Sequence, residues 1–188
     1  MKKIFIGIVW LGLLGSAPVV YAQTAANPAP IEYSEQVPAE GADQHLLYQW
    51  AVEWSENHFK YTPKLDVQAD QKAGTLRLWG SGKVKTATVA EKTSDVPVQF
   101  EFLFHLTGSG YEYSVGNFRV ILNARQPGTT LPLDDYAAKL VTERNNERTK
   151  NDRRVRAQAN SLANEVALSF RSFMNNKEAQ GSNHIGMK

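Results

Sequence analysis

The sequence predicts an α+β protein, in which an antiparallel sheet of about five strands carries helices packed on one of its faces. One observation behind this prediction is the segment 96–106, where every second residue from Val96 to Leu106 is apolar. The other is the pair of segments 43–59 and 155–173, where apolar residues recur at helical spacing. Each of these elements has one apolar face, so helices on one side of a meandering sheet would bury the faces together.

The first elements are a short strand and a helix. The strand covers 31–37 and ends at Pro38, because proline cannot donate to a strand ladder. The helix is predicted from Asp43 to Phe59, with the Asp43 carboxylate accepting a hydrogen bond from a free backbone N–H as the N-cap. Its apolar positions fall on one face, which comprises Leu47, Trp50, Ala51, Trp54 and His58.

Four further strands are predicted over 64–69, 75–86, 96–106 and 111–122. The first three each carry an apolar face. Turns connect the first pair and the last pair of these strands, since both connections contain glycine and polar residues that favour tight turns. The four strands therefore form an antiparallel meander.

The last of these strands changes phase along its length. Apolar residues occupy odd positions up to Val115 but even positions from Phe118 onward. Successive side chains alternate between the two faces of a sheet, so the apolar set changes position parity only where an extra residue is inserted. A β-bulge is therefore predicted near Gly116–Asn117.

The remainder of the domain is predicted to be helical. Pro132 to Tyr136 opens a helix, with Asp134 and Asp135 placed favourably at the positive end of its dipole. The longer helix that follows has a buried stripe of Val155, Ala159, Leu162, Ala163, Val166, Phe170 and Phe173. The expected order is thus strand, helix, four-strand meander and C-terminal helices.

The N-terminus is typical of a secretory signal peptide over residues 1–22. Two lysines precede an apolar stretch over 4–14, and small residues precede the expected cleavage after Ala22. The apolar stretch is about ten residues long, whereas a membrane-spanning helix needs about 20. We therefore expect an exported chain that begins at Gln23 and is periplasmic or secreted. Since cysteine is absent, there is no thiol to acylate, and a lipoprotein is not expected.

The exported chain divides into three parts. Residues 23–30 are rich in Ala and Pro and are expected to be flexible. Residues 31–175 are predicted to form a single α+β domain without internal repeats. Residues 176–188 are polar and lack periodicity, so a disordered tail is predicted there.

The charge balance argues against a nucleic-acid partner. The whole sequence has 21 Lys and Arg against 19 Asp and Glu. Cleavage after Ala22 removes two lysines and no acid, which leaves 19 of each and a formal net charge of zero. A neutral chain has no overall attraction to nucleic acid or to an anionic membrane.

Without cysteine the domain also has to rely on its apolar core rather than on disulfides.

An ordered series of turn and packing residues runs along the chain and comprises Leu47-Tyr48, Ala51, Trp54, Phe59, Lys60, Asp70, Ala73-Gly74, Gly80-Ser81-Gly82, Phe100, Phe102, Phe104, Tyr111, Tyr113, Asn117-Phe118 and Pro132-Leu133-Asp134-Asp135-Tyr136. This series resembles the bacterial exported family called domain of unknown function 4468. The resemblance covers roughly 31–175 and implies a TATA-binding-protein-like fold, with no activity attached to it. The charged stretch 143–156 departs from the family by being longer and more basic than expected.

No motif for catalysis, cofactor binding or metal binding stands out. The four histidines are not spaced as a metal-binding pair on a helix or a strand, and no Gly-x-Ser-x-Gly elbow or phosphate-binding glycine loop is present. We therefore predict no cofactor, no metal site and no catalytic residues.

Two sets of residues are candidate binding sites. The first would lie on the sheet face away from the helices, where a Trp and a Leu among polar neighbours would form an exposed apolar patch unless a loop such as 123–132 covers them. The second is a possible contact for an anion or a phospholipid headgroup within the charged stretch 143–156, which has as its alternative an ordinary solvated helix face. The two sets are Arg77, Trp79, Glu101, Leu103 and His105, and Arg153, Arg154 and Arg156.

Three functional hypotheses follow from these features. The first is a non-enzymatic binding module of the cell envelope, whose open sheet face holds an envelope protein or a small ligand. The second is a hydrolase or lyase whose site is assembled from dispersed residues such as Glu101, His105 and Arg77. The third is a protein held at a membrane surface by its basic helix, with no transmembrane helix in the mature chain.

Overall fold

The structure is a computed structural model that describes residues 30–123 and 128–185. The predicted signal peptide and most of the predicted flexible segment 23–30 lie outside these ranges. The elements follow one another as β1 Tyr33–Pro38, α1 Gln44–Asn57, β2 Leu65–Asp70, β3 Thr75–Ala87, β4 Thr93–Thr107, β5 Gly110–Ile121, β6 Thr130–Pro132, α2 Leu133–Thr142, α3 Asn146–Thr149 and α4 Asn151–Ile185.

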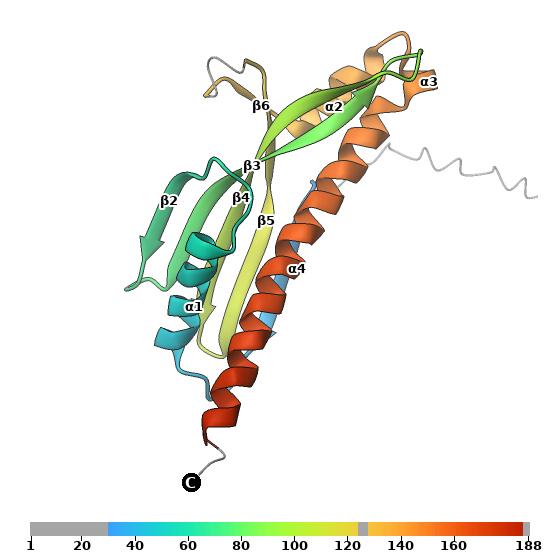
Figure 1. The fold of residues 1–188 in the computed structure, drawn as a ribbon. Coiled ribbons are helices and arrows are strands. Elements are labelled where there is room, and N and C mark those ends of the chain that lie inside the picture. The colour runs from blue at the N-terminus through green and yellow to red at the C-terminus, as the bar shows by residue number, and fades with distance from the viewer. Residues whose placement is uncertain (1–29, 124–127, 186–188) are drawn as a thin grey trace, which may run out of the picture.

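The strands form one antiparallel sheet in the order β1-β5-β4-β3-β2. The short strand β6 pairs with the end of β5, beyond the part of β5 that β1 covers. The helices α1 and α4 both lie over one face of the sheet, and α4 runs along its length (Figure 1). The predicted α+β class and its antiparallel sheet with helices on one face are confirmed. The strand β6 was not predicted, because three residues are too few to show an alternating pattern.

The core lies between the helices and the even-numbered residues of β3 and β4. Phe100, Phe102 and Phe104 are fully buried, together with Trp54 of α1 and Phe170 of α4. The ring of Phe170 lies 4.8–6.1 Å, centroid to centroid, from five other aromatic rings. This aromatic cluster joins both helices to the centre of the sheet.

The helix α1 begins as predicted, because the Asp43 carboxylate accepts a hydrogen bond of 2.8 Å from the backbone N–H of His45. Of the predicted apolar face, Leu47, Ala51 and Trp54 are buried and Trp50 is partly buried. His58 follows the last helical residue and is exposed, although its ring lies 4.6 Å from that of Phe173. His58 is thus a surface residue rather than part of the core.

The predicted β-bulge in β5 is present. Gln99 of β4 pairs with Arg119 and Glu101 pairs with Gly116, so Asn117 and Phe118 together face the single residue Phe100. Asn117 takes a left-handed backbone conformation, with φ of 49°. The extra residue lets β5 keep its apolar side chains on the core face on both sides of the bulge.

The strand β2 differs from its prediction. The residues of 64–69 were expected to turn an apolar face to the core, but Val67 is 53% exposed. A register shift between Leu65 and Gln68 inserts an extra residue, and Asp66 has φ of 49°. Because β2 is an edge strand, nothing in the described chain covers its outer side, and a bulge there disturbs no neighbouring strand.

The helix α4 extends further than predicted. Residues 176–188 were expected to be disordered, but α4 continues to Ile185. Lys177 donates a hydrogen bond of 2.8 Å to Glu53 of α1, and its ammonium lies 5.3 Å from the centre of the Phe173 ring. Met174 is fully buried one turn earlier. These contacts hold the helix to α1 beyond the end of the predicted domain at residue 175.

Two side-chain amides join the far end of β3 to α4. The strand β2 pairs with β3 only up to Trp79, and beyond it the N–H of Ser81 donates to the carbonyl of Tyr61, so this edge of β3 has no neighbouring strand in the described chain over its last residues. Asn151 receives a hydrogen bond from the N–H of Ala87 (2.8 Å) and donates one to its carbonyl (3.0 Å). Gln158 does the same for Lys85, at 2.9 and 2.8 Å. The two amides take the place of a neighbouring strand, so they fix the β3–β4 hairpin against the start of α4.

Candidate functional site

The five residues of the predicted open-face site lie on the face of the sheet away from α1 and α4. Arg77 and Trp79 come from β3, and Glu101, Leu103 and His105 come from β4. In the pairing of these strands Arg77 lies opposite Leu103, and Trp79 lies opposite Glu101. Their neighbours in sequence, such as Leu78 and Phe102, are fully buried on the other face. Strand alternation and register thus gather the five side chains on one surface.

The centre of this face is organised by a charged network. The Arg77 guanidinium forms an ion pair with one oxygen of the Glu101 carboxylate. The other oxygen accepts a hydrogen bond of 3.2 Å from the side chain of Asn117. Asn117 is the bulge residue of β5, so the bulge aims its amide at Glu101. Both oxygens of Glu101 are therefore held in place before any partner arrives.

The apolar residues of the face differ in exposure. Leu103 is 39% exposed, whereas Trp79 is half-buried. Trp79 lines a shallow hollow of about 330 Å³ together with Arg119, Gly128 and Thr130. Thr130 lies there because its hydroxyl accepts a hydrogen bond of 2.7 Å from Arg119. The end of the segment 123–132 therefore borders the hollow beside Trp79, and Leu103 stays open to solvent.

A second hollow borders Leu103 and has a volume of about 310 Å³. Its charged lining residues are glutamates and one histidine. His105 and Glu112 approach each other there, with 3.1 Å between Nδ1 and the carboxylate. The residues around the hollow are Glu32, Ser34, Glu35, Gln36, Leu103, His105, Glu112, Tyr113 and Ser114. Along β4, Leu103 lines the acidic hollow and Gln99 lines the one beside Trp79, with Glu101 between them.

The geometry does not assemble the residues named for a hydrolase or lyase. Glu101 and His105 are four residues apart along β4, which corresponds to about 13 Å. Glu101 is paired with Arg77, and His105 contacts Glu112 instead. Within the described ranges, no group of three or more His, Asp or Glu side chains is placed to hold a metal ion.

A polar network that sequence reasoning missed joins β1 and β5 to α4. The hydroxyls of Tyr113 and Tyr33 both donate to one oxygen of Glu35, and Arg171 of α4 lies 3.7 Å from the other. Arg171 also donates to the Tyr111 hydroxyl at 3.0 Å. The hydrogen bond from Tyr113 is the main cause that lowers the pKa of Glu35 below its usual value, and burial raises the pKa of Tyr111 to about 12. The only signal in the sequence was a glutamate at a core-facing position of the first strand.

Replacing Glu35 by Gln is expected to destabilise the fold by about 1 kcal/mol at neutral pH, because charge-assisted hydrogen bonds are lost. The pKa of Glu35 is lower in the folded than in the unfolded chain. Its contribution is therefore complete above the unfolded pKa and is lost as the pH falls through the folded value. Urea unfolding of both proteins should show a difference at pH 7 that shrinks below pH ~4. A difference in unfolding free energy that is the same at pH 7 and below pH ~4 would contradict this role.

The three arginines of the predicted anion site are not equivalent. Arg153 and Arg154 are exposed near the start of α4. Arg156 forms an ion pair with Asp134 of α2 and is only 21% exposed. Asp134 thus neutralises Arg156, and the expectation that all three guanidinium groups are available to an anion is corrected for this residue.

Together, the antiparallel sheet and the helices on one of its faces define an α+β protein. Residues 33–120 match the family described as "Domain of unknown function (DUF4468) with TBP-like fold". The predicted resemblance to this family is confirmed over these residues, which span β1 to β5. The match ends before α2, so the C-terminal helices lie outside it.

Two solved structures are similar to the chain. One is a TBP-like protein from Parabacteroides distasonis ATCC 8503, with 12% identity, a TM-score of 0.48 and coverage of 76% of this chain and 93% of that one. The other is a DUF4468 family protein from Bacteroides ovatus ATCC 8483, with 16% identity, a TM-score of 0.49 and coverage of 78% and 91%. A comparison with curated proteins gives no match. In the described part of the chain, no helix is long and apolar enough to cross a membrane.

Proposed function

We propose that this chain is an exported, non-enzymatic binding module that holds a protein of the cell envelope against the open face of its sheet. The observation that carries the proposal is Leu103, which is 39% exposed at the rim of the acidic hollow on a face opposite the helices. A large aliphatic side chain at the centre of an open sheet face is a common feature of a binding surface. Trp79 lies beside it, and tryptophan is enriched among the residues that dominate binding energy.

The surroundings of Leu103 support a specific contact rather than nonspecific hydrophobic binding. Arg77, Glu101 and Asn117 are already tied to one another, so they offer polar groups in fixed positions around the apolar residues. Such preorganisation lowers the entropy lost when a partner binds. The face thus combines an apolar centre with a rigid polar rim, as protein interfaces do.

The size of the hollows favours a macromolecular partner over a small ligand. Their volumes of about 310 and 330 Å³ are at the lower end of the range for pockets that enclose small molecules. Both are shallow, and Glu101 lies between them along β4. A protein segment lying across the sheet would fill both hollows and cover Leu103. The predicted signal peptide directs this encounter to a compartment outside the cytoplasm.

The proposal is tested by comparing two double variants of the exported chain. W79S/L103S removes the apolar centre of the open face, and V141S/L168S removes two exposed apolar residues from the helices. After chemical cross-linking in cells, the wild type and V141S/L168S should recover the same partner. The W79S/L103S variant should lose most of it, because each lost anchor lowers affinity at least about tenfold.

Circular dichroism and thermal unfolding of the purified variants accompany this comparison. W79S/L103S should remain folded, since Leu103 is exposed and Trp79 is half-buried. Retention of the partner by a folded W79S/L103S protein would overturn the proposal. Loss of folding would show instead that Trp79 and Leu103 serve the core.

A further inference from the structure

One end of the molecule gathers basic side chains from segments far apart in the sequence. The tip of the β3–β4 hairpin lies beside α3 and the start of α4, at the end away from the β4–β5 turn (Figure 1). The hydrogen bonds of Asn151 to Ala87 and of Gln158 to Lys85 fix this arrangement. We call this region the basic end, and define it by Lys85, Val89, Lys92, Arg148, Arg153 and Arg154.

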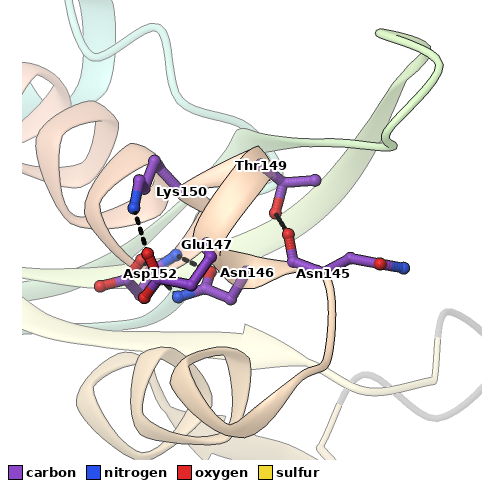
Figure 2. Close-up of polar contacts among 6 residues, drawn as sticks. All are labelled: Asn145, Asn146, Glu147, Thr149, Lys150 and Asp152. Atoms are coloured by element: carbon purple, nitrogen blue, oxygen red, sulfur yellow. Dashed lines mark hydrogen bonds and ion pairs between the residues drawn. The ribbon is translucent and has the colours of Figure 1, made fainter.

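Several acids near the basic end already have partners. Lys150 donates to Glu147 at 2.7 Å, and Asp152 accepts a hydrogen bond of 2.9 Å from Asn146; Figure 2 shows both contacts around α3. Asp95 pairs with Lys83 at 3.1 Å, and Asp134 pairs with Arg156. Glu147, Asp95 and Asp134 are thus neutralised by basic partners, whereas Asp152 keeps its charge and Glu91 in the hairpin turn is exposed. Five free basic side chains at this end therefore outnumber these two acids.

The basic side chains that define this end are free by comparison. Among the described residues, Lys85, Lys92, Arg148 and Arg154 are exposed and their side chains form no hydrogen bond or ion pair. Arg153 is also exposed and has only a longer-range attraction to Glu147 and Asp152. The basic end therefore has a local surplus of positive charge, although the exported chain as a whole is expected to be neutral.

An exposed apolar residue projects from the same end. Val89 is 47% exposed in the turn that closes the hairpin. This turn is tight, because the N–H of Thr88 donates to the carbonyl of Lys92 at 2.8 Å and the N–H of Lys92 donates to the Thr88 hydroxyl at 3.2 Å. Val89 is thus held on a rigid projection, with a free lysine three residues away.

From this arrangement we propose that the basic end docks on an anionic lipid surface. Free Lys and Arg side chains would attract the negatively charged headgroups, and the Val89 turn would enter the interface between headgroups and acyl chains. Local clusters of basic residues attract anionic leaflets within about a Debye length, and apolar side chains among them strengthen the contact. The docking would leave the open face of the sheet available to its own partner.

The test is co-sedimentation of the full mature chain with vesicles. Binding is expected to phosphatidylglycerol-containing vesicles at low salt and not to vesicles of phosphatidylcholine alone. It should disappear at about 1 M salt, where the Debye length is about 3 Å. The R153Q/R154Q variant should bind about 25-fold more weakly, since each basic residue near the surface contributes about fivefold.

The matched control is K60Q/K72Q, which removes the same charge from two exposed lysines away from the basic end. It should bind like the wild type, whereas V89D should bind more weakly than both. No binding to the anionic vesicles at low salt would overturn the proposal. An equal loss in K60Q/K72Q and R153Q/R154Q would also overturn it, because it would reflect total charge rather than this surface. W79S/L103S should bind vesicles normally, which separates this proposal from that for the open face.

Discussion

Replacing Phe170 by Ala is expected to destabilise the protein by about 3–5 kcal/mol, because a fully buried aromatic side chain leaves a large cavity. Phe170 is in contact with rings from α1 and from the sheet. Its centroid lies 5.0 Å from that of Trp54 in α1 and 4.8 Å from that of Tyr113 in β5. Urea unfolding followed by tryptophan fluorescence measures the change in the free energy of unfolding.

The control for this variant is Phe173→Ala on the same helix. Phe173 is only partly buried, and its ring contacts His58 and Lys177 at the surface. Its loss should therefore cost much less, about 1 kcal/mol. If the two variants were destabilised equally, Phe170 would not be the centre of the core.

Gly110→Ala is expected to have a comparably large effect, of about 3 kcal/mol or more. A Cβ atom at Gly110 would lie 2.1 Å from the carbonyl oxygen of Val37 and 2.7 Å from the nitrogen of Ala39. Both are backbone atoms, so relief requires β1 to move away from β5. We expect a lower unfolding midpoint and faster hydrogen exchange in β1, measured by urea unfolding and amide exchange.

The neighbouring Gly108 provides the matched control. A Cβ atom there would meet nothing within 4 Å, although Gly108 lies in the same turn. Gly108→Ala should therefore change stability by no more than about 0.5 kcal/mol. An equal cost for both substitutions would show that the turn, and not the contact with β1, requires glycine.

The central strands of this fold were predictable because their side chains alternate strictly. The apolar residues of β3 and β4 are buried as expected, and the phase change in β5 located the bulge at Asn117. The prediction failed at β2, because an edge strand can bulge and expose residues such as Val67 at little cost. It also failed for the end of α4, where Met174 is buried and Lys177 contacts Glu53 and Phe173, because these contacts leave no apolar periodicity in the sequence.

The candidate site was also predictable only as far as strand alternation determines it. Alternation alone placed Arg77, Trp79 and Leu103 on the open face. The network around Glu101 depends on the register of three strands and on the bulge, which a single strand pattern does not contain. The Glu35 network depends on β1 pairing with β5, a strand distant in sequence. Both networks depend on which strands pair and in which register, so they are visible in the structure and not in the sequence pattern.

The most direct test of the open face is site-specific photo-cross-linking in living cells. A photoreactive amino acid replaces either Leu103 on the open face or Leu168, which is 66% exposed on α4. If the sheet holds an envelope protein, position 103 should yield a discrete cross-linked product, and adding Trp79→Ser should weaken it. Position 168 should yield no such product. A product from position 168 alone, or none from position 103 in cells that export the folded protein, would contradict a binding role for this face.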